Sequence, residues 1–310
     1  MTGLVVGTYT ADMGGAGDGL LMLPGGRTVA TPSPSYVIAS GPVLYAVNEG
    51  AGTVSSFAAD DLRPLSTAST GGTWPCHLAL IDGYLLAANY GSGSVSVHPV
   101  TGGVIGSSTD LVRHSGAGPD AGRQEGPHTH QIVPGADGVV TVVDLGTDRL
   151  VDYRLEDGRL RRLGETALPP GSGPRHVVTH PNGRRYVAAE LGSALLTVAG
   201  GEVVASVPAT ASDGHNQPSG LVRSGDHLYL ANRGADTIAA FRVDASGAAV
   251  PLAEVPCGGA WPRDLALFDG GLVVANERSH TLTYFRLDDG VPVPSGEPTA
   301  VGSPTCVLPL

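Results

Sequence analysis

Lysine is absent from this chain. All 18 of its basic residues are arginine, so chemistry that needs a lysine amine is excluded, namely Schiff-base catalysis and the phosphate-binding lysine of a P-loop. The formal net charge of −11 and the lack of basic clusters also argue against nucleic acid and anionic membranes as partners.

Cysteine and long hydrophobic runs are scarce as well. The three cysteines, Cys76, Cys257 and Cys306, are scattered without a CxxC spacing, which predicts reduced thiols rather than a disulfide framework or a zinc site. No apolar stretch is long enough to cross a bilayer, and the opening MTGLVVGTYT lacks the charged start of a signal peptide. These features predict a cytoplasmic protein.

What the chain has instead is a repeated phrase. A proline opens an apolar strand, a turn follows, and a second strand ends in Ala-Asn or a related pair. The copies begin at Pro34, Pro75, Pro127, Pro174, Pro218 and Pro262. In four copies the same interval separates the proline from the asparagine, as from Pro75 to Asn89. A self-similar unit of roughly 40–50 residues made of short strands is typical of a β-propeller blade.

The two ends of the chain supply a seventh copy in two pieces. The C-terminal PTCVLPL, from Pro304, has the pattern of a first strand, and the N-terminal LVVGTYT and GLLMLP have that of second and third strands. A blade shared by the termini would close the ring and remove unpaired strand edges. We predict an all-β, seven-bladed β-propeller that forms one domain over residues 1–310. A six-bladed ring with terminal extensions is the alternative.

The geometry of a blade predicts where functional side chains gather. Because consecutive strands are antiparallel, the residue after each repeat proline lies at the same rim as the end of the second strand. The innermost strands line a central channel, so these positions should converge on one mouth. The residues after the prolines are Ser35, Cys76, His128, Arg175, Ser219 and Arg263. The residues at the second-strand ends are Glu49, Tyr90, Asp144, Glu190, Arg233 and Glu277.

Several members of this set are candidates for chemistry. His128 and His130, in GPHTHQI, lie two apart on one expected strand and should share a face, which suits acid–base catalysis or substrate binding better than metal ligation. Arg175 and Arg263 occupy one repeat position and are expected to bind an anion through forked hydrogen bonds, with pairing between blades as the alternative. Glu190 stands where most blades carry Asn and is a candidate general base.

Other repeat positions are expected to be structural. His77 and His176 lie between the positions that face the channel, so we predict that their side chains point into the blade packing. The repeated asparagines are predicted to cap turns rather than to contact a ligand.

Residues 115–126 form an unusually long, Gly-rich connection that leads to His128. A loop of this kind beside a channel mouth suggests a substrate lid. Arg123 and Gln124 could reach a ligand from it.

These blocks together resemble the seven-bladed propeller lactonases, the family of bacterial 6-phosphogluconolactonases and fungal 3-carboxy-cis,cis-muconate lactonizing enzymes. The resemblance covers nearly the whole chain and rests on VGTYT, RQEGPHTHQ, VVDLGTDRL, GPRHVVTHPNGRRYVAAEL, LYLANRGADTIAAF and WPRDLAL. It implies a lactone hydrolase or cycloisomerase that needs neither a metal nor another cofactor. The family's proposed active residues correspond here to His128 or His130, Arg175, Glu190 and Arg233, with Arg263 nearby.

The expected reaction is ring opening of a sugar-acid lactone such as 6-phosphogluconolactone, or its reverse in a muconate-type acid. Arginines would hold the anionic group and stabilise the oxyanion, one of the two histidines would activate water, and Glu190 would orient that histidine or act as the base itself. The chain contains no GxSxG motif, so a covalent acyl-enzyme is not expected. The remaining candidate substrate contacts are Arg123, Gln124, Glu49 and Glu277.

Two further functions stay open at this point. A metal-dependent propeller lactonase would bind a Ca²⁺-like ion through oxygen ligands from Glu49, Asn89, Asp144 and Asn232. A non-catalytic propeller would bind a partner on one face of the ring. The expected partner is a small anionic lactone or carboxylate, and the acidic surface and closed ring favour a monomer.

Overall fold

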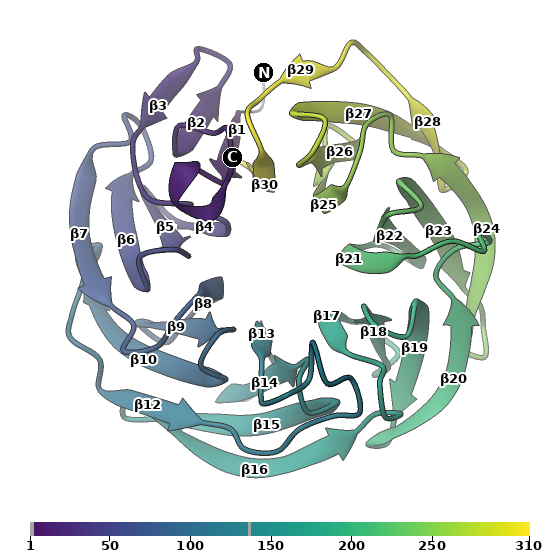
Figure 1. Ribbon diagram of the computed structural model, residues 1–310, viewed down its shortest axis with the longest axis horizontal. Coiled ribbons are helices and arrows are strands. Elements are labelled where there is room, and N and C mark those ends of the chain that lie inside the picture. The colour runs from purple at the N-terminus through teal and green to yellow at the C-terminus, as the bar shows by residue number, and fades with distance from the viewer. Residues whose placement is uncertain (1–2, 136–137) are drawn as a thin grey trace.

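The strands form seven antiparallel sheets arranged around a central axis (Figure 1). The structure, a computed structural model, describes residues 3–135 and 138–310. Each sheet is one blade, so the predicted seven-bladed propeller is confirmed. One strand of each blade lies nearest the axis, namely β4, β8, β13, β17, β21, β25 and β30.

The strands of the seven blades have the following bounds. Blade 1 contains β4 (Val37–Ser40), β5 (Val43–Asn48), β6 (Thr53–Ala58) and β7 (Pro64–Ser69). Blade 2 contains β8 (Pro75–Ile81), β9 (Tyr84–Asn89), β10 (Ser94–Thr101), β11 (Val104–Ile105) and β12 (Asp110–Arg113). Blade 3 contains β13 (Thr129–Pro134), β14 (Val139–Asp144), β15 (Arg149–Glu156) and β16 (Arg159–Ala167). Blade 4 contains β17 (Pro174–Thr179), β18 (Arg185–Ala189), β19 (Ala194–Ala199) and β20 (Glu202–Pro208).

The second half of the ring repeats the pattern. Blade 5 contains β21 (Gln217–Ser224), β22 (His227–Arg233), β23 (Thr237–Val243) and β24 (Ala249–Pro256). Blade 6 contains β25 (Pro262–Phe268), β26 (Gly271–Asn276), β27 (Thr281–Asp288), β28 (Val291–Pro294) and β29 (Thr299–Ala300). Blade 7 contains β30 (Pro304–Pro309), β1 (Leu4–Thr8), β2 (Leu20–Leu23) and β3 (Arg27–Val29), with the 3-10 helix η1 (Ala11–Met13) after β1.

The hydrophobic core lies between neighbouring blades. Leu86 and Val95 of blade 2, for example, pack in one buried cluster with Val142 and Tyr153 of blade 3. A second strand such as β9 is covered on both faces by adjacent blades, and its sequence is accordingly apolar without alternation. Because this packing buries both faces of the second strand, each repeat contains a continuous apolar run in the sequence.

The ring closes through a blade built from both ends of the chain. Strand β30 pairs antiparallel with β1, with Leu4 opposite Pro309 and Gly7 opposite Cys306. The sheet order β3–β2–β1–β30 confirms the predicted division of the seventh blade. Closure pairs β1 with a strand from the other end of the chain, so β1 is not left as an unpaired edge.

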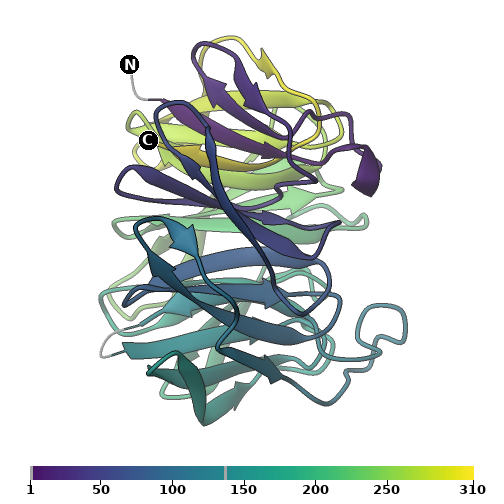
Figure 2. The same ribbon diagram turned by 90° about the vertical axis from the view of Figure 1, so that its left-hand side faces the viewer.

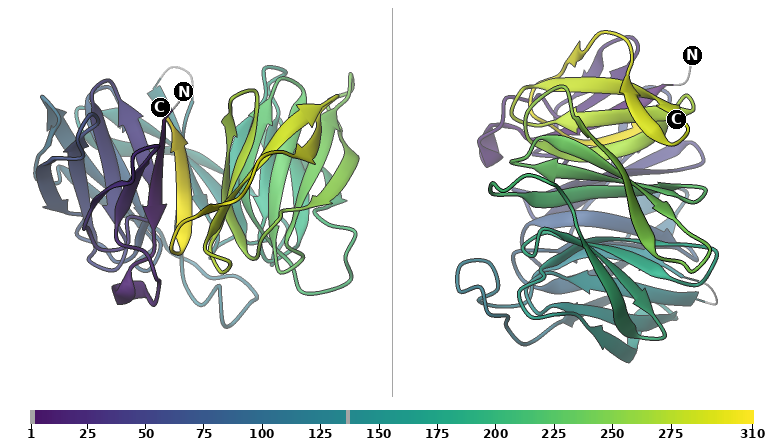
Figure 3. Two further views of the ribbon diagram at one scale, coloured as in Figure 1. Left: turned by 90° about the horizontal axis from the view of Figure 1, so that it is seen from above. Right: turned by 90° about the vertical axis from the view of Figure 1, so that its right-hand side faces the viewer.

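The two faces of the ring differ. Helix η1 and the loop between β12 and β13 project from the same face, while the start of β1 and the end of β30 lie toward the other (Figures 2 and 3). The inner strand β30 begins at the face that carries these projections. Among residues 3–135 and 138–310, no helix is long and apolar enough to cross a membrane.

Closure predicts that a charge buried in β30 will destabilise the whole ring. Val307 is 4% exposed and packs against residues of blade 6, so Val307→Asp should lower the free energy of unfolding by roughly 3 kcal/mol or more. Thermal unfolding measures the change, expected as a loss of roughly 5–10 °C. Leu310→Asp is the control, since Leu310 is 44% exposed. Equal effects of both changes would contradict a closing role for β30.

Candidate active site

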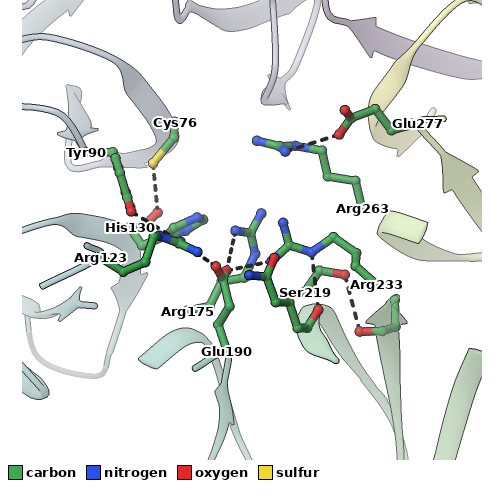
Figure 4. Close-up of polar contacts among 12 residues, drawn as sticks. Cys76, Tyr90, Arg123, His130, Arg175, Glu190, Ser219, Arg233, Arg263 and Glu277 are labelled. Carbon is green, nitrogen blue, oxygen red and sulfur yellow. Dashed lines mark hydrogen bonds and ion pairs between the residues drawn. The ribbon is translucent and has the colours of Figure 1, made fainter. Parts of the chain in front are cut away.

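A pocket with a volume of about 250 Å³ lies beside η1 and the β12–β13 loop, since Met13 and Arg123 line it. Figure 4 shows the polar residues at its centre. Seven of the twelve residues at the two repeat positions named above line this pocket, whereas Ser35, His128, Ser219, Asp144 and Glu277 do not. The lining consists of Met13, Glu49, Trp74, Cys76, Tyr90, Arg123, His130, Arg175, Glu190, Gln217, Arg233 and Arg263.

A β-bulge in the inner strands directs four of these side chains into the pocket. In blades 2, 3, 4 and 6 the pairing with the second strand skips one residue, and the skipped residues are Cys76, His130, Arg175 and Arg263. A bulged residue has no partner on the neighbouring strand, and the local bend re-aims its side chain. The same irregularity in four blades therefore directs side chains from around the ring into a common site.

Blade 3 uses this pattern two residues later than the sequence repeat predicts. Thr129 pairs with the end of the second strand, as the repeat prolines of blades 2, 4 and 6 do, so Thr129 occupies the position that we gave to Pro127. The bulge then falls at His130, which lines the pocket. His128 precedes the strand and is not a lining residue, so the two histidines do not simply share a strand face.

The second-strand position in blade 3 shifts as well. Asp144 corresponds to the asparagines of other blades, and the residue at the position of Glu190 is the buried Leu145. Asp144 accepts backbone N–H groups from His128 at 2.8 Å and Gly146 at 3.1 Å. Its carboxylate therefore shapes the turn of blade 3 and does not enter the pocket.

The carboxylate of Glu190 lies at the centre of the site and contacts three guanidinium groups. Its Oε1 accepts from Arg123 at 2.6 Å, and its Oε2 lies 2.8 Å from Arg175 Nη1 and 2.7 Å from Arg233 Nη2. Burial alone would raise the pKa of Glu190, but these cations outweigh it and hold that pKa well below its ordinary value. Glu190 is thus a permanent carboxylate that aligns the arginines.

Several buried nitrogens in this cluster lack a hydrogen-bond partner among the described residues. They are Arg175 Nε, Arg233 Nη2 and His130 Nδ1. Arg233 Nη2 is close enough to Glu190 for ion pairing, but the contact does not have hydrogen-bond geometry. Unpaired buried polar groups are costly, and these three nitrogens belong to residues that line the pocket.

The fourth arginine belongs to a second cluster on the opposite side of the pocket. Arg263 donates to Glu277 at 3.2 Å and to the hydroxyl of Tyr9, and its guanidinium lies 4.6 Å from the centre of the Tyr9 ring. Tyr9 OH in turn lies 3.0 Å from both carboxylate oxygens of Glu49. Burial raises the pKa of Tyr9, so this phenol stays neutral. Glu277 reaches the site through Arg263 and does not itself line the pocket.

Tyr9 was not among the residues singled out from the sequence. It lies in the VGTYT block, in the half-blade that precedes the first full repeat. Trp74, Met13 and Gln217 were also missed, although Trp74 and Gln217 stand directly before repeat prolines. Attention to the residue before each proline could have found these two.

Trp261 supports one of the arginines from outside the pocket. Its ring lies 5.5 Å from the guanidinium carbon of Arg233 and 3.4 Å from that of Arg278. Arg233 Nε also donates to the backbone carbonyl of Gln217 at 3.2 Å. Burial lowers the pKa of Arg233 to about 9, which still leaves it charged at neutral pH, and the nearby carboxylate of Glu190 favours that charge.

The two histidines of the HxH pair have different surroundings. His130 contacts the rings of Tyr90 and His176 edge to face, at centroid distances of 5.8 and 5.7 Å. Burial, and then the charge of Arg175, hold the pKa of His130 well below its ordinary value, so its imidazole is neutral. His128 stacks on Tyr90 at 4.4 Å, and its Nδ1 lies 2.9 Å from the Tyr90 carbonyl oxygen.

The prediction for His77 and His176 was wrong. The ring of His77 stacks on Tyr36 at 4.0 Å and lies 6.1 Å from that of His176. These residues belong to blades 2 and 4, which are not neighbours, so the contact crosses the channel. The bulge at the preceding residue breaks the alternation on which the prediction rested. Burial lowers the pKa of His77 to about 3, so the layer below the pocket is uncharged there.

The loop between β12 and β13 sends one of its two candidate residues into the pocket. Arg123 Nη2 donates to Glu190 and lies 3.3 Å from Tyr90 OH. Gln124 is fully buried, and its amide donates to Leu145 O at 2.8 Å and to Asp148 Oδ1 at 2.9 Å. Gln124 therefore anchors the loop and lies outside the pocket lining, contrary to the expected ligand contact.

The repeated asparagines cap turns, as predicted. Asn48 donates to Thr53 and Ser55 at 2.8 Å each, and Asn232 donates to Ala209 O at 2.7 Å. Within the described part of the chain, no group of three or more His, Cys, Asp or Glu side chains is arranged to hold a metal ion. Cys76, although it lines the pocket, has its thiol pKa raised by burial and so is not a thiolate.

Comparison with known proteins agrees with this architecture. A family model described as "Lactonase, 7-bladed beta-propeller" matches residues 4–309. The 6-phosphogluconolactonase of Bacillus subtilis (strain 168) is 36% identical over 285 residues, which cover 83% of this chain and 80% of that protein. The periplasmic gluconolactonase PpgL of Pseudomonas aeruginosa has a TM-score of 0.90 at 27% identity, covering 100% of this chain and 99% of that one. A protein from Lactobacillus plantarum has a TM-score of 0.92, also at 27% identity, with 100% coverage of both chains.

The contacts of Glu190 predict a stability effect that depends on pH. At pH 7, Glu190→Gln should cost about 3–5 kcal/mol of unfolding free energy, because it leaves buried arginines without their counter-charge. A carboxylate with a depressed folded pKa stabilises the fold above its unfolded pKa, near 4.5, and that stabilisation is lost as pH falls further. The difference between wild type and variant should therefore shrink below pH 4.5.

Chemical unfolding between pH 7 and pH 3 measures this difference. Glu277→Gln is the matched control, since Glu277 pairs with one arginine and its side chain is 18% exposed. If the difference in unfolding free energy between wild type and Glu190→Gln stays constant over this range, the buried ion cluster is not its cause.

Proposed function

Because the chain belongs to the family of seven-bladed β-propeller lactonases, we propose that it hydrolyses the ring ester of an anionic sugar-acid lactone. The relative from Bacillus subtilis bears the name 6-phosphogluconolactonase, which makes 6-phosphogluconolactone the first candidate substrate. The single observation that carries the proposal is the arginine array with unpartnered nitrogens at the channel mouth.

The charge of the pocket favours an anionic substrate. Its lining contains four arginines against two glutamates, in a chain whose net charge is −11. A positive pocket raises the local concentration of small anions at its mouth, even in an acidic protein. Guanidinium groups fit phosphate and carboxylate oxygens through paired hydrogen bonds. Among the described residues, Arg175 Nε has no partner of its own, and Arg233 Nη2 has only its ion pair with Glu190.

The proposed chemistry begins at His130. Its neutral imidazole takes a proton from water while the water oxygen attacks the lactone carbonyl carbon. Arginine N–H groups stabilise the negative charge that develops on the carbonyl oxygen. The ring C–O bond then breaks, and the leaving alkoxide takes the proton back from the imidazolium. The product is the open hydroxy acid, and the histidine ends as it began.

Substrate binding would also tune this base. In the free protein, burial and the charge of Arg175 depress the pKa of His130. A bound anion offsets that charge and moves the pKa back toward neutrality, where a general base is most effective. Binding and activation of the base are thereby coupled.

Glu190 serves this mechanism as a positioning residue. A carboxylate held ionised by three guanidinium groups is a poor proton acceptor, so the role of general base fits it badly. Its contribution is to keep Arg123, Arg175 and Arg233 in one array. His128, which stacks on Tyr90 behind the pocket, is proposed to support the wall rather than to take the proton.

The first functional prediction concerns the two histidines. Wild-type protein should open 6-phosphogluconolactone and related lactones faster than buffer, with rates insensitive to EDTA. His130→Asn should lower kcat by roughly 10²- to 10⁴-fold, the usual contribution of a general base, and the matched variant His128→Asn much less. Initial rates corrected for spontaneous opening provide the measurement.

Other outcomes of this assay would each redirect the proposal. Rates no better than buffer over the whole panel would favour a binding propeller or a cycloisomerase. Loss of activity with EDTA would favour a metal-dependent lactonase. A larger loss in His128→Asn than in His130→Asn would move the base to His128.

The second functional prediction concerns pH. Because kcat/KM reports the free enzyme, its acid limb should fall below pH 6.5, following the depressed pKa of His130. The acid limb of kcat reports the complex and should lie at higher pH, since the bound anion raises that pKa. Rate profiles from pH 4 to pH 8 separate the two limbs. Coincident limbs would contradict the coupling of binding to the base.

A further inference from the structure

The residue before the repeat proline adopts a left-handed backbone in five blades. The φ angles are 39° at Ser33, 52° at Trp74, 54° at Gly173, 61° at Trp261 and 40° at Ser303. This conformation favours glycine and is a genuine outlier for a bulky side chain. A following proline restricts the backbone further. The fold therefore accepts small residues here without difficulty, but a tryptophan only at a cost.

Both tryptophans of the chain stand at this unfavourable position. Strained residues of this kind persist where function or the surrounding structure requires them. Trp261 has an evident role, because its ring supports the guanidinium groups of Arg233 and Arg278. Trp74 stacks on no arginine in the described part of the chain, and half of its surface is exposed at the pocket.

Gly91 is a second feature that leaves room for the indole of Trp74. A Cβ atom at Gly91 would lie 3.0 Å from the indole Cε3 of Trp74 and 2.7 Å from Thr73 Oγ1. Gly91 itself lies outside the left-handed region, so its missing side chain provides space rather than backbone freedom. Two local features, a left-handed tryptophan and a glycine beneath it, thus hold a flat apolar surface open at the mouth.

The position of this surface relates it to the charged wall. Trp74, Cys76 and Tyr90 belong to blade 2, whereas Arg175, Glu190 and Arg233 belong to blades 4 and 5. Figure 4 shows Tyr90 and Cys76 on one side of the pocket, with Arg123 beside Tyr90, and Arg175, Arg233 and Arg263 farther across it. The aromatic side chains of blade 2 therefore face Arg175 and Arg233 across the cavity, and Arg123 reaches in beside Tyr90.

We propose that Trp74 is a stacking residue that binds the C–H face of a sugar ring while the arginines across the pocket hold its anionic group. The inference rests on the proposed function for the chemical class of the ligand, an anionic sugar ring. It adds a residue that selects ring-shaped anions over acyclic ones. A pocket with arginines alone would bind any small anion of similar charge.

Glucose 6-phosphate tests the inference apart from catalysis, because it is an anionic ring without a lactone bond. Trp261→Phe leaves Trp74 as the single tryptophan, so its emission reports binding at the pocket directly. We expect glucose 6-phosphate to change this emission, and inorganic phosphate to change it much less.

Affinity and kinetics of Trp74 variants provide the second arm. Trp74→Ala should weaken glucose 6-phosphate binding by roughly three- to tenfold, the range of an aromatic contact, and leave phosphate binding unchanged. With a lactone substrate the same change should raise KM by a similar factor, with kcat kept. Trp74→Phe should restore most of the affinity for glucose 6-phosphate and most of the original KM.

Trp74→Gly separates this role from a structural one. Glycine fits the left-handed backbone better than alanine, so Trp74→Gly should be at least as stable as Trp74→Ala while showing the same loss of ring binding. Recovery of ring affinity in the glycine variant would attribute the loss to strain and overturn the proposal.

The remaining outcomes distinguish the inference from the proposed function. Lactone turnover with an unchanged KM in Trp74→Ala would overturn the stacking role and leave the lactonase standing. Ring binding that depends on Trp74, without any lactone turnover, would support the stacking role and overturn the proposed lactonase activity. If the protein neither binds glucose 6-phosphate nor hydrolyses a lactone, both the stacking role and the proposed function are overturned. Binding of a protein partner by the exposed indole would then be the better explanation.

Discussion

A single buried carboxylate sets the geometry of the pocket. Glu190 contacts guanidinium groups that come from its own blade, from blade 5 and from the loop between blades 2 and 3. Without it, these like charges would repel one another in a space where water screens them poorly. With it they become an ordered set of donors that points at the channel axis. The β12–β13 loop, which carries Arg123, and the ring of Trp261 beside Arg233 both help to hold these guanidinium groups in position.

The propeller supplies this arrangement by repeating one irregularity. In blades 2, 3, 4 and 6, a bulge near the start of the inner strand brings the bulged side chain into the mouth. The blades therefore differ in chemistry while their backbones stay alike: Cys76, His130, Arg175 and Arg263 share one position. A repeat of short strands becomes a site because the variable residues all fall at one rim, where the ring brings them together.

This repeated construction also determines which features of the structure can be predicted from the sequence. Apolar runs and the constant interval from Pro75 to Asn89 predict the blades, the closure and the charged mouth, because those depend on strand spacing. The bulges are invisible in spacing, and they reverse the orientation expected for His77. In blade 3 the long loop ends at a proline that lies two residues too early, so His128 was aligned with the site in place of His130. The amide of Gln124 could not be assigned either, since its partners lie on a turn more than 20 residues away.

The site can also be recognised by where the chain departs from what its own fold favours. Most residues obey local rules, as the asparagine caps and the left-handed Gly173 show. Around the pocket the rules are broken together: buried arginines keep unpartnered nitrogens, and Trp74 occupies a backbone that suits glycine. Each departure costs folding free energy, and a closed ring with cores between all its blades can absorb several. Packing alone would favour smaller and less polar residues at this mouth. A ligand that accepts the free N–H groups and covers the indole accounts for both departures at once.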